Sequence, residues 1–340
     1  MQKTFIYFSA VFLSILTACN ANKKKEAVSF LSSKETILFN QVVYKVNHKD
    51  SFAKYAPGYD IVFLPQPVNG NLALIVKNKN TEQYALVIRG SLIEFSNAGF
   101  QNFILQDFNI FTIKKWQYAD TVKEAYISNG THTGFQNLLQ LRDSSTGLTI
   151  KEFIEQKIPA GASIVITGHS LGGNLAYPLA GYLKKELPVE KKNRLQLVTF
   201  GAPAAGNAAF VQDLEEKFPT AERYVTDKDI APVFPDLDRI NEMAKLIGLD
   251  SVLQLAKLNI GGSEIDAADL LNIGSEILGK TNIINKTNKY VQSQKHLRIL
   301  TINNPASVNS PLSVDAIFEN AYRFHKVDIY AELLGGKALN

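Results

Sequence analysis

A Gly-x-Ser-x-Gly pattern centred on Ser170 occupies residues 168–172. The apolar run at 163–167 precedes it and a helix-compatible segment follows it, which is the strand–turn–helix context of a nucleophile elbow. A serine hydroxyl is a weak nucleophile near neutral pH, so it needs an exposed position and an adjacent base. A sharp turn would supply the exposure, and we interpret His169 as a structural residue that shapes it. The pattern predicts Ser170 as a catalytic nucleophile; the alternative is an ordinary turn of small residues.

A nucleophile of this kind also needs hydrogen-bond donors for the oxyanion that forms as it attacks. The backbone N–H of the next residue, Leu171, is one expected donor. The second is expected from the loop after a neighbouring strand, and Ser91 follows the apolar run at 84–89. Gly90 would permit a tight turn there, and the alternative is that Gly90 and Ser91 form only a turn.

The acid and the base are expected to follow the nucleophile, in the order serine, aspartate, histidine. Asp229 opens a proline-containing loop after a predicted strand at 223–226, and Asp227, nearer to the strand end, is its competitor. His296 and His325 are the histidines that follow Asp229. His296 opens a predicted strand, where we expect it to satisfy local hydrogen bonds, and His325 stands near the C-terminus. Both remain candidates on this reasoning.

Strands and helices alternate along the chain. Short apolar runs predict strands at 61–64, 71–76, 84–89, 163–167, 195–200, 223–226 and 297–302. Helices are expected at about 31–46, 175–187 and 314–334. Parallel strands that are buried on both faces read as continuous apolar runs, as most of these do. The alternation predicts the α/β class, with a mostly parallel central sheet and helices on both faces.

The bulk composition excludes several classes of function. The chain has 340 residues, of which 46% are hydrophobic and 20% charged, as in a globular protein with a sizeable core. The net charge of +4 is modest and spread among many lysines, so we expect no nucleic-acid partner. Residues 274–281 match the P-loop pattern, but the segment before them looks helical where that motif requires a strand, so no nucleotide is expected. Without a His-Glu-x-x-His motif or a cysteine cluster, we expect neither zinc nor any cofactor.

The N-terminus has the pattern of an exported protein. Lys3 and the apolar stretch at 5–16 lead into Leu-Thr-Ala-Cys, which ends at Cys19. This is a secretory signal pattern, and its apolar part is too short for a comfortable membrane span. Leu-x-Ala-Cys resembles a bacterial lipobox, and Cys19 is the only cysteine of the chain. We therefore expect residues 1–19 to be a lipoprotein signal peptide and Cys19 to be lipidated; a plain cleaved signal or an uncleaved anchor is the alternative.

A polar, lysine-rich stretch at 20–29 is predicted to be a tether between this lipid anchor and the folded domain. Several acyl chains on one residue would hold the protein firmly on a membrane. Asn20 follows the cysteine where an aspartate would favour the inner membrane, which points to the outer membrane. The expected location is an exported, membrane-anchored bacterial lipoprotein, with the leaflet left open.

Six segments of the chain resemble the class 3, or fungal-type, lipases. They lie at 88–91, 132–135, 168–173, 199–203, 229–232 and at His325 with Tyr330 five places on. The resemblance implies a catalytic triad of Ser170, Asp229 and His325 and an oxyanion donor at Ser91. The stretch 290–296 resembles a family block whose histidine is not catalytic, which favours His325 over His296. The resemblance runs from about 72 to 335 and departs at Ala231, where a valine is typical.

The resemblance also implies one α/β-hydrolase domain at 30–340. The chain differs from the family mainly at about 236–289, where it is longer than the family usually is. We interpret this stretch as a helical insertion, and it leaves the choice of substrate open. Two segments could cover an apolar pocket: 92–118, which is rich in aromatic residues, and 239–285, which reads as two amphipathic helices. We favour 92–118 because it follows directly from the strand that should border the site.

The implied reaction is cleavage of lipid carboxylic esters through an acyl-enzyme, as in a triacylglycerol lipase or a related lipid esterase. A phospholipase and a short-chain or polysaccharide esterase are the enzymatic alternatives. The non-enzymatic alternative is a surface lipoprotein that binds lipid but has lost turnover. The expected partners are a lipid or other ester substrate and the membrane that holds the anchor, and the protein is expected to be a monomer.

Overall fold

The computed structural model describes residues 28–90, 112–120, 124–236, 239, 242, 257–260, 263–266, 290–303 and 322–339. Several expectations lie outside these residues: the signal peptide and Cys19, almost all of the tether, Ser91, residues 92–111, the P-loop-like stretch and most of the insertion at 236–289. The described residues contain the central sheet, the helices on both of its faces and the segments that carry Ser170, Asp229 and His325.

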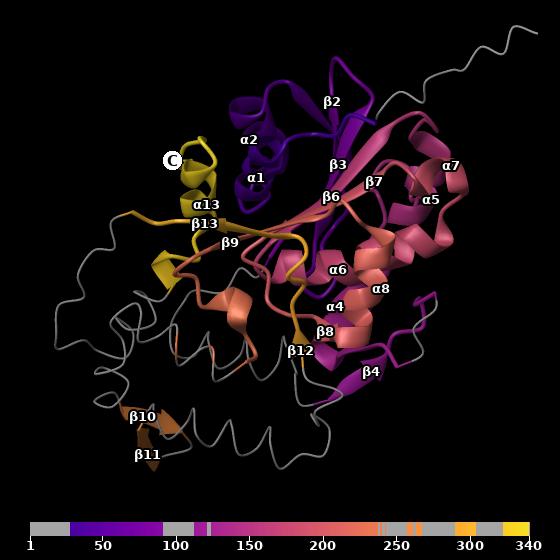
Figure 1. Cartoon of the computed structure of the whole chain (residues 1–340). Coiled ribbons are helices and arrows are strands. Elements are labelled where there is room, and N and C mark those ends of the chain that lie inside the picture. Colours follow the sequence, from indigo (N-terminus) through magenta and orange to yellow (C-terminus); the bar gives the residue numbers. More distant parts are fainter. Residues whose placement is uncertain are drawn as a thin grey trace, which may run out of the picture.

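A seven-stranded sheet forms the centre of the protein (Figure 1). Its strands lie in the order β1 (Tyr59–Phe63), β2 (Ala73–Asn78), β3 (Gln83–Ile88), β6 (Ser163–His169), β7 (Leu195–Phe200), β9 (Glu222–Thr226) and β13 (Leu297–Leu300). Neighbouring strands from β3 to β13 are parallel, whereas β1 and β2 pair antiparallel at one edge. The predicted α/β class with a mostly parallel central sheet is confirmed.

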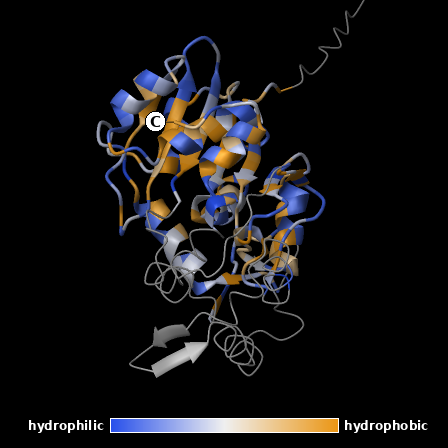
Figure 2. Ribbon diagram, turned by 90° about the vertical axis from the view of Figure 1, so that its left-hand side faces the viewer, coloured by the Kyte–Doolittle hydropathy of each residue, from blue (hydrophilic) through white to orange (hydrophobic). Residues whose placement is uncertain are grey.

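Helices cover both faces of this sheet. One face carries α4 (Asn129–Gln140), α5 (Ile150–Lys157), α6 (Leu171–Glu186), α7 (Val189–Lys192) and α8 (Ala208–Lys217). The other carries α1 (Ser33–Val42), α2 (His48–Tyr55) and α13 (Val327–Leu333). Along β6, Ile164 and Ile166 join the first core and Val165 the second, because successive side chains of a strand point to opposite faces. Figure 2 shows the resulting hydrophobic interior between more polar helix surfaces.

The carboxyl ends of the parallel strands meet at one edge of the sheet. Ile88 at the end of β3 pairs with Gly168, and His169 at the end of β6 pairs with Phe200 of β7. The elbow therefore stands between the ends of its two neighbouring strands. In open α/β sheets this is the edge at which ligands bind.

Helix α6 begins directly after Ser170, four residues before the start that the sequence predicted. The N–H of Asn174 donates to the Ser170 carbonyl at 3.1 Å, which closes the first turn. Gly172 and Gly173 stand in that turn, and their poor helix propensity explains the late prediction. Pro178 lies inside the helix. Packing against the sheet, and not propensity, sets the helix start.

Helix α5 was not predicted, although its start has a sequence signal. Thr149 and Glu152 form a reciprocal capping box, in which each side chain accepts from the backbone N–H of the other. At the other end, the buried Lys191 donates from Nζ to three backbone carbonyls, those of Ile154, Glu155 and Ile158, each at 2.6 Å. A lysine from α7 thus caps α5 across the fold.

Two smaller sheets accompany the central one. A four-stranded antiparallel sheet has the order β12 (Tyr290–Val291), β8 (Gly206–Asn207), β5 (Tyr126–Ser128) and β4 (Ile113–Lys115). A hairpin of β10 (Lys257–Ile260) and β11 (Ser263–Asp266) lies within the insertion that the sequence predicted to be helical, between its two predicted helices. The strands are too short for an alternation signal, which is why the sequence did not predict them.

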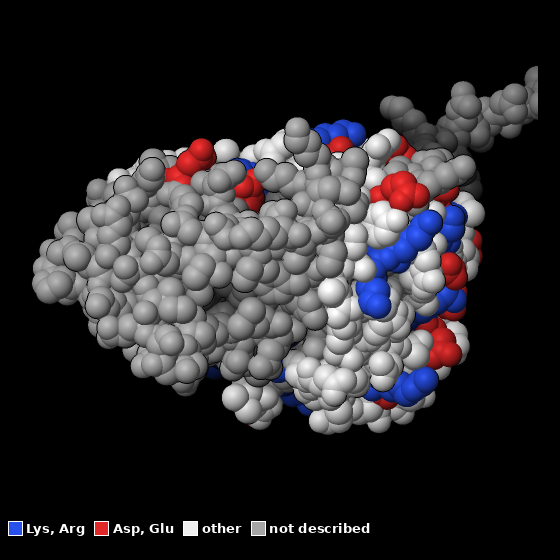
Figure 3. All heavy atoms as spheres, turned by 90° about the horizontal axis from the view of Figure 1, so that it is seen from below, with Lys and Arg blue, Asp and Glu red and all other residues white. Residues whose placement is uncertain are grey.

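Within the described part of the chain, no helix has both the length and the apolar character needed to span a bilayer. The face seen in Figure 3 shows lysine and arginine side chains interspersed with acidic ones over its described portion.

Candidate active site

The turn that holds Ser170 is strained. Ser170 has φ 58° and ψ −130°, a backbone conformation that non-glycine residues rarely adopt. Such a residue costs about 1–3 kcal/mol and persists where the surrounding structure enforces it. A Cβ at Gly168 would lie 2.2 Å from the backbone of Gly172, and a Cβ at Gly172 would lie 2.2 Å from the carbonyl oxygen of Ile88. Only glycine fits at both flanks, so the tight turn accounts for the spacing in the pattern.

The structure brings the three predicted catalytic side chains together. His325 Nε2 lies 2.7 Å from Ser170 Oγ, and His325 Nδ1 lies 2.8 Å from Asp229 Oδ2. All three side chains are buried, with exposed fractions of 7% or less. A carboxylate only accepts, so Nδ1 carries the imidazole proton and Nε2 is left to accept from the serine hydroxyl. This arrangement can move a proton from Ser170 to His325.

Two further donors hold the Asp229 carboxylate. The Tyr330 hydroxyl donates to Oδ2 at 2.5 Å, and the Ala231 N–H donates to Oδ1 at 2.8 Å. Burial and the negative charge of Asp229 raise the pKa of Tyr330 well above its usual value, so the phenol remains a donor. The Thr226 N–H donates to the same phenol oxygen at 3.2 Å and fixes its position.

The competing carboxylate, Asp227, serves a different purpose. Its Oδ1 accepts from the Ile302 N–H at 3.1 Å, and its own N–H donates to the Leu300 carbonyl. Asp227 thus joins the ends of β9 and β13, whereas Asp229, two residues further on, meets His325.

His169 makes contacts that its sequence position alone did not reveal. Its Nε2 lies 2.7 Å from the backbone carbonyl oxygen of His325, and its Nδ1 lies 3.2 Å from the Tyr44 hydroxyl. Burial, and then the charge of His325, hold the pKa of His169 well below its usual value, so the ring is neutral. A neutral ring with its proton on Nε2 donates to His325 and accepts from Tyr44. Tyr44 follows α1, and no sequence signal linked it to this site.

Of the two expected oxyanion donors, Leu171 lies among the described residues and Ser91 does not. Leu171 is the first residue of α6, so its N–H has no acceptor within the helix. Ser91 lies outside the described residues, but Gly90 before it is described. A Cβ at Gly90 would lie 2.2 Å from the Tyr44 hydroxyl and 2.7 Å from the carbonyl oxygen of His169. This close approach brings the end of the 84–90 segment against the elbow.

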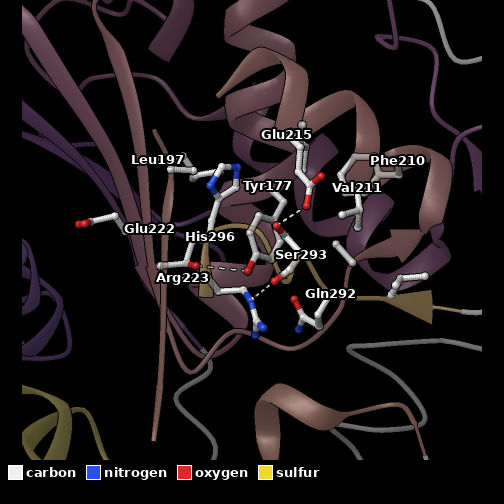
Figure 4. Close-up of a pocket in the computed structure, with 15 residues that line it drawn as sticks. Tyr177, Leu197, Phe210, Val211, Glu215, Glu222, Arg223, Gln292, Ser293 and His296 are labelled. Atoms are coloured by element: carbon white, nitrogen blue, oxygen red, sulfur yellow. Dashed lines mark hydrogen bonds between the residues drawn. The ribbon is translucent and has the colours of Figure 1, made fainter. Parts of the chain in front are cut away.

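The other candidate base lies away from this cluster. The backbone carbonyl of His296 accepts from the Arg223 N–H of β9 at 2.9 Å, and its side-chain Nε2 is buried without a hydrogen-bond partner. The local hydrogen bonds that the sequence led us to expect for this side chain are not seen among the described residues. His296 lines a separate cavity with Tyr177 and Gln292 (Figure 4). Among the described residues, no group of three or more histidine, cysteine, aspartate or glutamate side chains is arranged to hold a metal ion.

Comparison with known proteins agrees with this geometry. The family model described as "Lipase (class 3)" matches residues 86–238. Phospholipase A1-Igamma2, chloroplastic, of Arabidopsis thaliana is 35% identical over 80 residues, which cover 22% of this chain and 15% of that protein. Lipase ZK262.3 of Caenorhabditis elegans is 33% identical over 72 residues, which cover 21% and 20% of the two chains. The chain thus matches a fifth or less of the length of each of these relatives.

Among solved structures, the crystal structure of M37 lipase superposes with a TM-score of 0.65 at 22% identity. The match covers 90% of this chain and 94% of the M37 lipase chain, so the likeness extends to the whole fold. Residues 86–238, which include the elbow and the Asp229 loop, match the model of the class 3 lipase family, and the chain as a whole has the α/β-hydrolase fold.

Proposed function

We propose that this protein is a serine hydrolase that cleaves the carboxylic esters of lipids through an acyl-enzyme. The observation that carries the proposal is the 2.7 Å contact between His325 Nε2 and Ser170 Oγ, with Asp229 on the far side of the imidazole. The match to the class 3 lipase family supports ester hydrolysis as the reaction class.

In the first step, Ser170 Oγ attacks the ester carbonyl carbon while its proton passes to His325 Nε2. Asp229 stabilises the imidazolium that forms, and Tyr330 and the Ala231 N–H keep the carboxylate in place. The N–H of Leu171 and a donor at Ser91 hold the oxyanion; one such donor lowers the barrier by about 2.7–4 kcal/mol. When the C–O ester bond breaks, the leaving alcohol takes the proton from Nε2.

In the second step, water attacks the acyl-enzyme. His325 removes a proton from the water, and the oxyanion is held by the same donors. The intermediate then collapses, Ser170 Oγ regains its proton from His325, and a free carboxylic acid leaves. Ser170, Asp229 and His325 supply every proton transfer in these two steps.

A long-chain lipid ester is the proposed substrate. The proposal rests on the aromatic-rich segment 92–118, which comes after β3 in the sequence, and on the family match. A phospholipid is the second candidate, because one relative, which is 35% identical over 80 residues, is a phospholipase A1. Rates on a triacylglycerol, a phosphatidylcholine and p-nitrophenyl acetate would separate these substrates; faster turnover of the acetate would contradict the long-chain preference.

The serine mechanism is tested with a fluorophosphonate probe. We expect the wild type to be labelled and Ser170→Ala to remain unlabelled. Ser163→Ala is the matched control, because Ser163 is a buried serine at the opposite end of the same strand, where its hydroxyl donates to the Ser29 carbonyl. Folded wild-type protein that takes no label would support a lipid-binding protein without turnover.

We further propose that Cys19 is lipidated and anchors the exported chain to a bacterial outer membrane. The signal pattern at 1–19 and the polar tether at 20–29 support this location. Metabolic labelling with a fatty acid should modify the wild type and spare Cys19→Ala, which should appear in the soluble fraction. Membrane retention of Cys19→Ala without label would contradict the anchor.

A further inference from the structure

The side chain of Gln292 joins two loops that border the proposed triad. Gln292 follows β12 directly and is 8% exposed. Its Nε2 donates to the carbonyl oxygen of Ala202 at 2.7 Å and to that of Pro232 at 3.2 Å. Because carbonyl oxygens only accept, the nitrogen of the amide and not its oxygen must face both partners. Gln292 thus places its two amide protons on two separate loops.

The first of these loops carries Gly201, which lies against the proposed acid. Gly201 follows β7 and has φ 56°. A Cβ at Gly201 would lie 2.9 Å from Asp229 Oδ2 and 3.1 Å from His325 Cε1. The backbone of Gly201 therefore forms one wall beside the carboxylate. Ala202, whose carbonyl accepts from Gln292, is the next residue in the chain.

The second loop supplies a donor to the same carboxylate. The Ala231 N–H donates to Asp229 Oδ1 at 2.8 Å, from the start of a short 3-10 helix at Ala231–Val233. Pro232, whose carbonyl also accepts from Gln292, is the next residue in the chain. Each hydrogen bond of Gln292 thus falls one residue beyond a backbone position that borders the Asp229 carboxylate.

Gln292 has no substitute as the donor to these carbonyls. Ala202 and Pro232 are buried, and within the described part of the chain no other donor reaches either carbonyl oxygen. A buried carbonyl without a donor is unfavourable. Both loops are therefore most stable where one amide can serve them together.

The backbone on either side of Gln292 is itself held in place. Val291 before it pairs with β8. The Ser293 carbonyl after it accepts from Arg223 Nε at 3.0 Å, and the Ser293 hydroxyl donates to Glu215 at 2.5 Å (Figure 4). Because its backbone is fixed on both sides, the amide of Gln292 can hold its two partners at constant positions.

We propose that Gln292 is a positioning residue for Asp229. By fixing Ala202 and Pro232, it holds the two backbone segments beside the carboxylate, so that Oδ2 keeps its 2.8 Å contact with His325 Nδ1. The inference rests on the proposed function, in which Asp229 stabilises the imidazolium of His325.

The kinetic test compares Gln292 with a second glutamine. Gln292→Met removes both donors and keeps the length of the side chain, and kcat on a p-nitrophenyl ester should fall roughly five- to fiftyfold with KM unchanged. Gln292→Asn keeps the amide on a shorter side chain and should lose less. Gln196→Met is the matched control, because the Gln196 amide donates to the Thr220 carbonyl, at the end of β7 away from Gly201. It should change kcat less than about twofold.

A double-mutant cycle shows whether Gln292 acts through Asp229. In the Asp229→Asn background, Gln292→Met should change kcat less than about twofold, because the charge that Gln292 positions is gone. A full loss of kcat in that background would overturn the inference. An unchanged kcat in Gln292→Met, or a loss that appears only as a raised KM, would also overturn it.

The proton NMR resonance of His325 Nδ1–H tests the same contact without turnover. It is assigned by its loss in His325→Ala, and it should move in Gln292→Met but not in Gln196→Met. An unmoved resonance in Gln292→Met would overturn the inference even if the protein hydrolyses esters. If the wild type is inactive, the proposed function fails and the resonance alone decides the role of Gln292. Urea unfolding shows which variants are folded, and Gln292→Asn provides the result if Gln292→Met is not.

Discussion

The ring of His169 holds the backbone of His325: Nε2 of the first lies 2.7 Å from the carbonyl oxygen of the second. The two rings also lie against each other, with centroids 4.7 Å apart. The residue beside the nucleophile therefore positions the residue that is proposed to activate it. This contact joins the end of β6 to the segment before α13, which is 156 residues away in the chain.

The neutral state of His169 predicts a pH dependence of stability. Its pKa is lowered in the folded protein by burial and by His325, so the unfolded chain binds more protons as the pH falls below about 6.5. The free energy of unfolding should fall with pH in that range, by up to about 1.4 kcal/mol per pH unit for this one group. Urea unfolding at pH 7.5 and 5.0 should show a smaller loss for His169→Gln than for the wild type; equal losses would exclude His169 as a source.

The two aspartates that competed for the role of acid provide a matched pair of variants. Asp229→Asn removes the charge beside His325 and disturbs the ring tautomer, so kcat should fall by about 10⁴-fold, the size seen when a triad carboxylate is changed in this way. Asp227→Asn keeps an acceptor for the Ile302 N–H and should change kcat less than threefold. Steady-state kinetics on one ester measures kcat for both variants. Similar losses of kcat in both variants would contradict the assignment of Asp229 as the triad acid.

The Tyr330 hydroxyl is a positioning group for Asp229. Tyr330→Phe keeps the buried ring and removes the donor to Oδ2, a hydrogen bond worth about 1–2 kcal/mol. We expect kcat to fall roughly five- to thirtyfold with little change in KM. Tyr224→Phe is the control, because the Tyr224 hydroxyl donates to Glu222 and not to Asp229. A rise in KM at constant kcat would instead indicate a role in substrate binding.

Lys191 is predicted to be a stabilising residue with no part in catalysis. Lys191→Met leaves three carbonyls near the end of α5 without their donor, and the free energy of unfolding should fall by about 2–4 kcal/mol. Lys192→Met alters the next lysine, for which no side-chain hydrogen bond is present among the described residues, and should cost less than about 0.5 kcal/mol. Chemical denaturation measures both. Lys191→Met with wild-type stability would show that water replaces the lysine.

Local patterns in the sequence predicted most strands of the central sheet and the three side chains that meet at the elbow. Buried parallel strands are continuous apolar runs, and the predicted strand at 195–200 coincides with β7. Ser170 stood out because only glycines fit beside it, and Gly168 and Gly172 are visible in any reading of the chain. Asp229 and His325 could be ordered by the chain sequence of a triad and by the family blocks, which are also local.

Contacts between segments that are distant in the chain could not be predicted from local sequence patterns. The Tyr44 hydroxyl meets His169, and Lys191 meets the end of α5, because packing brings separate helices together. The Thr149–Glu152 capping box was a local signal, and it marks the start of a helix that the apolar pattern alone did not reveal.

Trapping of the acyl-enzyme would show whether Ser170 is the nucleophile and His325 its base. The protein is mixed with a p-nitrophenyl ester, quenched with acid within milliseconds to seconds, digested and analysed by mass spectrometry. We expect an acyl group on the peptide that contains Ser170, formed in the wild type and greatly reduced in His325→Ala. Rapid ester hydrolysis with no acyl group on that peptide, or with acylation of Ser170 at the wild-type rate in His325→Ala, would contradict these two roles.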